Sequence, residues 1–201
     1  MTRSASLPHL LEQLERIEPG AHFSGSLPHV LSSSRKSYYA KCGSPREADQ
    51  YVGEAESLKA MASAAPGLVP SLLALGLVDE NGKETEGSEG RPFFISEYKE
   101  ITPLTERAGA ILGRRLAMEM HTYMSAKGFG FDVPTFCGAT RLRNGWYGSW
   151  EQCFDTLIGD LLSTLAGRGG YSELCLKGQD VRTKRVSSPL LSFRSSLCPS
   201  G

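Results

Sequence analysis

Hydrophobic and polar positions repeat with a helical period in four parts of the chain, one of which, 48–61, follows a predicted strand. Residues 7–18, LPHLLEQLERIE, place four leucines and one isoleucine on one side, and Pro19-Gly20 ends the pattern. The longest apolar stripe runs through 104–127, and the segment 150–165 is amphipathic as well. These patterns predict one helix that covers a sheet early in the chain and core helices later.

Short apolar runs between these segments predict strands. The run YYAK (38–41) precedes a polar turn and a predicted helix over 48–61. Two further runs, 68–78 and 92–98, flank the acidic, turn-rich loop 79–90 and read as a hairpin. The order of helix, two strands, helix and two strands predicts an α+β unit with an antiparallel sheet.

The helix over 48–61 carries a carboxylate on its apolar side. On a helical wheel Glu54 lies inside the arc that contains Tyr51 and Leu58. A carboxylate on a buried face is costly without a partner, and the nearest basic candidate is Lys41. Such a pair positions a lysine on nucleotide phosphates in kinase-like folds. The alternative is a lysine on an edge strand and a glutamate on the solvated rim of its helix.

A second candidate is the small-residue stretch Ser24, Gly25 and Ser26, which is predicted to be a turn between two extended runs. Backbone N–H groups in such a turn can approach a phosphate. The alternative is an ordinary hairpin turn, because the stretch has one glycine and Pro28 follows it.

Composition narrows the function classes. Hydrophobic residues make up 40% of the 201 positions and charged residues 22%, which is typical of a globular protein. Basic and acidic residues number 22 each, so no nucleic-acid partner is expected. No apolar run approaches the ~18 residues of a membrane span. No signal-peptide core precedes Glu12 either, so we expect no membrane partner and a cytoplasmic location.

The cysteines support neither a zinc site nor a disulfide framework, because they are scattered and odd in number. They are Cys42, Cys137, Cys153, Cys175 and Cys198. Strand alternation points Cys42 away from the face that carries Lys41, which favours a packing role for its thiol.

With these elements in order, the chain resembles the fructosamine/ketosamine kinase family, the protein-ribulosamine 3-kinase-like branch of the kinase-like phosphotransferases. The resemblance extends from Phe23 to Leu162. The motifs that carry it are YYAK with Lys41, GEAESLKAM with Glu54, FFISEY, LGRRLAMEMH and, above all, FGFDVPTFCGATRLRNGWYGSW. It implies a protein-kinase-like fold, in which an antiparallel-sheet N-lobe is followed by a helical C-lobe.

The resemblance also implies an activity and a site. Family members use ATP and Mg²⁺ to phosphorylate O3 of fructosamine or ribulosamine adducts, on a glycated protein or a small ketosamine, and so repair glycated proteins. By resemblance, Lys41 holds the α- and β-phosphates and Glu54 orients it. The adenine pocket is assigned to the backbone of Glu97 and Tyr98 and the side chain of Tyr39. The phosphate turn is assigned to Ser24, Gly25 and Ser26, although they depart from a glycine-rich pattern.

Phosphoryl transfer also needs an Asp that accepts the hydroxyl proton, and an Asn and a second Asp that hold Mg²⁺. The family's HGDLWSGN-like loop is missing. The nearest echo, IGDLLSTL, lacks the histidine and has Leu165 five residues after Asp160. We therefore assign no catalytic residue and no metal ligand, and expect a chain truncated before the catalytic loop and inactive as written. The alternative is a non-catalytic, pseudokinase-like module that binds nucleotide or a protein.

Three segments are expected from these patterns. Residues 1–101 form the nucleotide-binding N-lobe, and 102–165 form the start of an incomplete helical C-lobe. Residues 166–201 are a divergent tail in which basic residues outnumber acidic ones and serines crowd the end, so we expect it to be poorly ordered.

Overall fold

The structure is a computed structural model that describes residues 6–86 and 89–186. The chain divides into two compact units, Met1–Tyr123 and Met124–Gly201. In the described ranges, no helix has both the length and the apolar character needed to cross a membrane.

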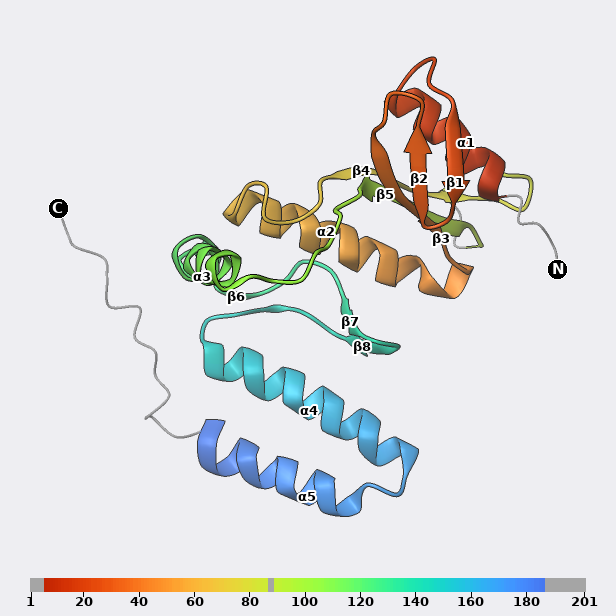
Figure 1. Cartoon of the computed structure of the whole chain (residues 1–201). Coiled ribbons are helices and arrows are strands. Elements are labelled where there is room, and N and C mark those ends of the chain that lie inside the picture. The colour runs from red at the N-terminus through yellow and green to blue at the C-terminus, as the bar shows by residue number, and fades with distance from the viewer. Residues whose placement is uncertain (1–5, 87–88, 187–201) are drawn as a thin grey trace. The chain divides into compact units, whose positions relative to one another are not determined.

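The first unit is built on a five-stranded antiparallel sheet with the order β1-β2-β3-β5-β4 (Figure 1). The strands are β1 (Phe23–Ser26), β2 (His29–Ser32), β3 (Ser37–Cys42), β4 (Leu72–Val78) and β5 (Arg91–Glu97). Helix α1 (Ser6–Ile17) precedes the sheet, and the 3-10 turn η1 (Pro45–Glu47) leads from β3 into α2 (Ala48–Ala64). The predicted α+β class and the antiparallel pairing of the strands are confirmed.

Helix α1 covers one face of the sheet, because its apolar stripe meets alternate residues of the strands. The buried cluster on this face consists of Leu10, Leu14, Val30, Tyr38, Ala40, Val78, Phe93 and Ile95. Cys42 is partly buried against the same cluster, as predicted. Side chains alternate along a strand, so Tyr39 and Lys41 point to the opposite face.

Helix α2 covers that opposite face (Figure 1). Its cluster contains buried Tyr51, Ala55 and Phe94, with Tyr39, Leu58, Leu72 and Leu75 partly buried against them. The Ser44 N–H donates to the Glu47 carboxylate at 2.7 Å, a capping arrangement that satisfies a free N–H group before α2 begins. One sheet thus carries two separate apolar layers, and β3 contributes side chains to both.

The helix predicted over 104–127 is wrong in its length. Helix α3 (Glu106–Arg115) passes into a single π-helical turn, η2 (Leu116–Met120), which ends where the His121 N–H donates to the Leu116 carbonyl at 3.0 Å. A π turn holds an extra residue, so it takes later residues out of phase with the apolar stripe. Met124 lies beyond the end of the helix and is 76% exposed.

The second unit begins with two nested hairpins. Strand β6 (Phe129–Gly130) pairs with β9 (Trp146–Tyr147), and β7 (Thr135–Cys137) pairs with β8 (Thr140–Leu142). The Asn144 side-chain amide donates to the Val133 carbonyl at 2.8 Å, and the Trp146 indole N–H donates to Asp132 at 2.8 Å. This glycine- and aromatic-rich segment therefore folds on its own side chains, as predicted.

Two helices and a π turn follow in the described part of the second unit: α4 (Trp150–Arg168), α5 (Ser172–Val181) and η3 (Arg182–Val186). Poor order was expected from residue 166 onward, but the structure has helical elements up to Val186. Helix α5 packs on α4 because Gly178 has no side chain and the Leu162 side chain fills that space. The last part of the expected tail, 187–201, lies outside the described residues.

Candidate nucleotide-binding site

Lys41 and Glu54 form an ion pair in the first unit. The Lys41 Nζ lies 2.6 Å from Oε2 of Glu54. Their side chains are 24% and 39% exposed, so the pair lies at the border between the α2 layer and solvent. The predicted pairing is confirmed, and the edge-strand alternative is wrong because β3 is the central strand of the sheet. The role of the pair toward a nucleotide stays a prediction.

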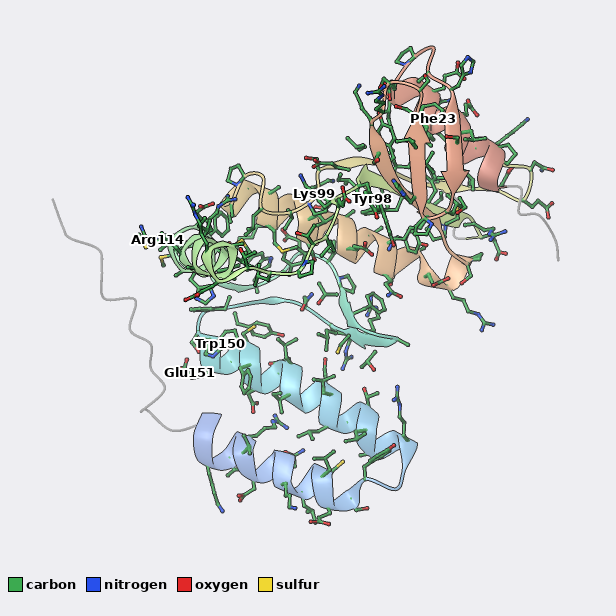
Figure 2. The ribbon with its side chains drawn as sticks, in the orientation of Figure 1. Phe23, Tyr98, Lys99, Arg114, Trp150 and Glu151 are labelled. Carbon is green, nitrogen blue, oxygen red and sulfur yellow. The ribbon has the colours of Figure 1, made fainter. Side chains whose placement is uncertain are left out.

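A pocket of about 580 Å³ opens beside this pair. Its walls come from β3, α2, β5 and the segment after β5, where Figure 2 shows Tyr98 and Lys99. The lining residues are Tyr39, Glu54, Leu58, Pro70, Phe94, Ser96, Glu97, Tyr98, Lys99, Glu100 and Ile101. Four predicted site residues are therefore brought together here, namely Tyr39, Glu54, Glu97 and Tyr98. The volume is in the range of pockets that hold small ligands, about 300–1,000 Å³.

The backbone of the predicted adenine segment is partly engaged. The Glu97 N–H donates to the Ser71 carbonyl at 2.9 Å, and the Tyr98 N–H donates to the Ser37 carbonyl at 3.2 Å. Lys99 Nζ lies 2.6 Å from the Glu97 carboxylate and holds the pKa of that carboxyl below its usual range. An adenine edge in this pocket therefore has to use polar groups other than these two N–H groups.

The Tyr98 ring is covered on one face by His29, the first residue of β2. The two ring centroids are 4.0 Å apart and the planes are inclined by 13°. No second flat ring fits between rings at that separation, so a nucleobase that uses Tyr98 has to take its other face or displace the imidazole.

The predicted turn over Ser24, Gly25 and Ser26 needs correction, while their role toward phosphate stays a prediction. Ser24, Gly25 and Ser26 belong to strand β1, where they pair with Leu31, Val30 and His29. The turn itself is formed by residues 27 and 28. Gly25 has a φ of 105°, and a Cβ there would lie 2.8 Å from the His29 carbonyl oxygen. The small residue thus permits close strand pairing, and these three residues do not line the 580 Å³ pocket.

Sequence reasoning missed two of the three aromatic rings around Lys41, those of Tyr51 and Phe94. Its Nζ lies 4.6 Å from the ring centroid of Tyr51, 5.1 Å from that of Phe94 and 5.9 Å from that of Tyr39. Tyr51 and Phe94 read as ordinary core positions in the sequence. The available signal was strand pairing, since Phe94 is directly opposite Lys41 in the β3–β5 register.

A magnesium site is not found in the part of the chain that the structure describes. No group of three His, Cys, Asp or Glu side chains lies close enough there to hold a metal ion. Asp160, in the nearest echo of the catalytic loop, lies on α4 and accepts hydrogen bonds from Arg143 at 2.8 and 3.2 Å. Asp160, already bound by Arg143, does not by itself fit a bound Mg²⁺.

Comparison with known proteins agrees with this geometry. The sequence profile of the fructosamine kinase family matches residues 13–184. Among solved structures, the chain is similar to a candidate fructosamine-3-kinase from Haemophilus somnus 129PT, with a TM-score of 0.62 and 18% sequence identity. No curated protein matches the chain.

The structural match covers 92% of this chain and 62% of that relative, so the chain spans less than two thirds of the relative's length. At 18% identity, the match shows a shared kinase-like fold. The family profile, in contrast, covers well over half of the sequence. The chain belongs to the fructosamine kinase family.

Proposed function

We propose that this chain binds ATP in the pocket between β3, β5 and α2 and supplies the nucleotide-binding part of a ketosamine kinase. The observation that carries the proposal is the 2.6 Å ion pair between Lys41 and Glu54. The pair adjoins a pocket that Tyr39, Glu97 and Tyr98 also line. Membership of the fructosamine kinase family supports the same function.

The proposed role of Lys41 follows from its chemistry. An ammonium has three N–H donors, and one of them is directed at Glu54. The other two N–H donors can point toward phosphate oxygens, which carry the charge of ATP. Glu54, which lines the pocket, holds the end of the flexible lysine stem, so the charge is in place before the nucleotide arrives.

We propose fructosamine or ribulosamine adducts as the substrates of the whole protein, with phosphate transfer to O3 of the sugar in the cytoplasm. Transfer requires an Asp near the acceptor hydroxyl and metal ligands. The described residues offer no such ligand set. We therefore propose that this chain alone binds ATP without turning it over, which is the behaviour of a nucleotide-binding module.

The first test is the affinity of the chain for ATP, measured by titration of a fluorescent ATP analogue and its displacement by ATP. Lys41→Ala is expected to abolish binding or weaken it at least about tenfold, a loss typical of a charge-assisted phosphate contact. Lys59→Ala is the matched control, because this exposed α2 lysine pairs only with Glu56 on its own helix among the described residues. A wild-type chain that binds no ATP would overturn the proposal.

The second test is transfer. The chain is incubated with ATP, Mg²⁺ and a ribulosamine-bearing peptide, and the peptide mass is followed. We expect no added phosphate from the chain alone. A phosphorylated product would support the kinase assignment and contradict the proposed inactivity.

A further inference from the structure

We infer that Tyr51 is a positioning residue for Lys41. The Tyr51 ring, together with the rings of Phe94 and Tyr39, holds the lysine ammonium beside Glu54. The inference rests on the proposed function, because it concerns the lysine proposed to meet the phosphates of ATP. The inference adds a second determinant of ATP affinity to the Lys41–Glu54 pair.

The rings reach Lys41 from three elements. Tyr51 comes from α2 and its ring centroid is nearest to Nζ, at 4.6 Å. Phe94 comes from β5 at 5.1 Å, and Tyr39 comes from β3 itself at 5.9 Å. An ammonium within about 6 Å of a ring centroid is attracted by the negative face of the ring. All three rings meet this condition at the same time.

The ring set is packed on itself and so has a defined position. Tyr51 and Phe94 meet edge to face with centroids 6.5 Å apart, and Tyr39 and Phe94 do the same at 6.5 Å. Phe94 is 1% exposed and Tyr51 6% exposed, so neither ring is free to turn away into solvent. The ammonium therefore meets fixed ring faces.

Gly43 sets the approach of Tyr51 to β3. A Cβ at position 43 would lie 2.9 Å from Cε2 of Tyr51 and 3.1 Å from Cγ of Pro92. The strand end needs a glycine here for the ring to reach its place under Lys41. Gly43→Ala is thus a way to move the ring without changing Lys41, Glu54 or Tyr51.

Helix α2 supplies both attractions that act on Lys41. Tyr51 and Glu54 are three residues apart and so lie on one side of the helix, one turn from each other. The Glu54 carboxylate accepts a hydrogen bond from the ammonium, and the Tyr51 ring attracts its charge. Together they fix the end of a side chain that otherwise has four rotatable bonds.

The test compares Tyr51→Phe with Tyr51→Leu by affinity for the fluorescent ATP analogue. Phe keeps the ring face and is expected to bind within about twofold of wild type, whereas Leu is expected to weaken binding roughly threefold to tenfold. Gly43→Ala is expected to weaken binding in the same direction. Equal affinities for Tyr51→Leu and Tyr51→Phe would overturn the inference.

A double-mutant cycle without nucleotide separates this inference from the proposed function. Unfolding constants are measured for Tyr51→Leu, Lys41→Met, the double variant and the wild type. We expect a coupling of roughly threefold to tenfold in the unfolding constant, because Leu at 51 costs less once the ammonium is gone. Purely additive effects would show that Tyr51 acts by packing alone, whether or not the chain binds ATP.

Discussion

The Tyr38 hydroxyl donates a hydrogen bond of 2.7 Å to Oε2 of Glu18, which ties the central strand β3 to the residue that follows α1. The Ser34 hydroxyl donates to the other carboxylate oxygen. These bonds, that of Ser34 first, lower the pKa of Glu18 to about 2 from its ordinary value of 4.5. Glu18 is thus a charged junction between helix and sheet.

The first prediction concerns pH. A carboxyl whose pKa is lowered by folding adds stability that is complete above its unfolded pKa and is lost as pH falls through the folded value. The contribution of Glu18 should therefore be full above pH 4.5 and disappear as pH approaches 2. Thermal unfolding of Glu18→Gln between pH 7 and 2 should show a melting temperature below that of wild type at neutral pH, and a difference that narrows in acid.

Glu15→Gln is the control for this series, since it changes an exposed carboxylate on α1. It should follow the wild-type pH profile. A Glu18→Gln profile parallel to that of wild type down to pH 2 would show that the junction does not depend on the charge.

The second prediction concerns the carboxylate that holds Lys41. Glu54→Gln keeps the shape of the side chain and removes its charge, so Lys41 loses a charge-assisted partner. We expect affinity for ATP to fall roughly threefold to tenfold, less than for Lys41→Ala. Glu56→Gln, on the same helix and paired with Lys59, should leave affinity unchanged. Unchanged affinity in Glu54→Gln would mean that the phosphates alone orient the lysine.

The third prediction concerns the β6–β9 hairpin. Gly130 has a φ of 150°, and a methyl group there would overlap the backbone oxygen of Gly145. Gly130→Ala should lower the free energy of unfolding by about 2 kcal/mol or more, because neither backbone can give way without losing the pairing. Calorimetry measures the loss.

Gly148→Ala is the matched control in the same hairpin region. A Cβ at Gly148 would have no heavy atom within 4 Å, and its φ lies outside the left-handed range. This variant should have the same melting temperature as the wild type. Equal destabilisation by both substitutions would contradict the steric argument.

The fourth prediction concerns the end of the described chain. The Arg182 guanidinium donates two hydrogen bonds of 2.7 Å to Asp155, joining η3 to α4. Arg182→Lys loses the fork but keeps the charge, and because the pair is partly exposed the cost should be only about 0.5–1 kcal/mol. Amide hydrogen exchange in α5 and η3 should accelerate about two- to fivefold. Lys184→Met, which removes a surface pair with Asp180, should leave the exchange rates unchanged.

Much of the N-terminal unit follows from local patterns. The apolar stripe of α1 places Leu10 and Leu14 in the core, although Leu11 is 40% exposed. The alternation of β3 places its residues on the correct faces, since burial selects that period directly. The helical wheel also placed Glu54 beside Lys41, because a carboxylate on an apolar face has to find a cation. These inferences needed only neighbouring residues.

Other features depend on contacts that no local pattern records. The Ser24–Ser26 stretch looks like a turn by composition, yet pairing with β2 extends β1 through it. The apolar stripe over 104–127 gives no sign of the π turn at η2, where Arg115 binds Glu119 and the Pro66 carbonyl. Tyr51 and Phe94 look like core residues because they are core residues. Their closeness to Lys41 appears only in the fold, because strand pairing brings Phe94 opposite Lys41 and the packing of α2 on the sheet brings Tyr51 to it.

The two-sidedness of β3 has a consequence for how this gene can vary. Tyr38 and Ala40 pack in the α1 layer, while Tyr39 and Lys41 lie on the opposite face. Residues of the two faces alternate along the strand. Deleting or inserting a single codon within β3, before position 41, would exchange the two sets and direct the ammonium into the apolar cluster beneath α1. A substitution in β3 affects the packing on one face only, but the two-residue alternation of its side chains must be kept. We therefore expect length polymorphism among relatives to be confined to segments such as 79–90 and to spare this strand.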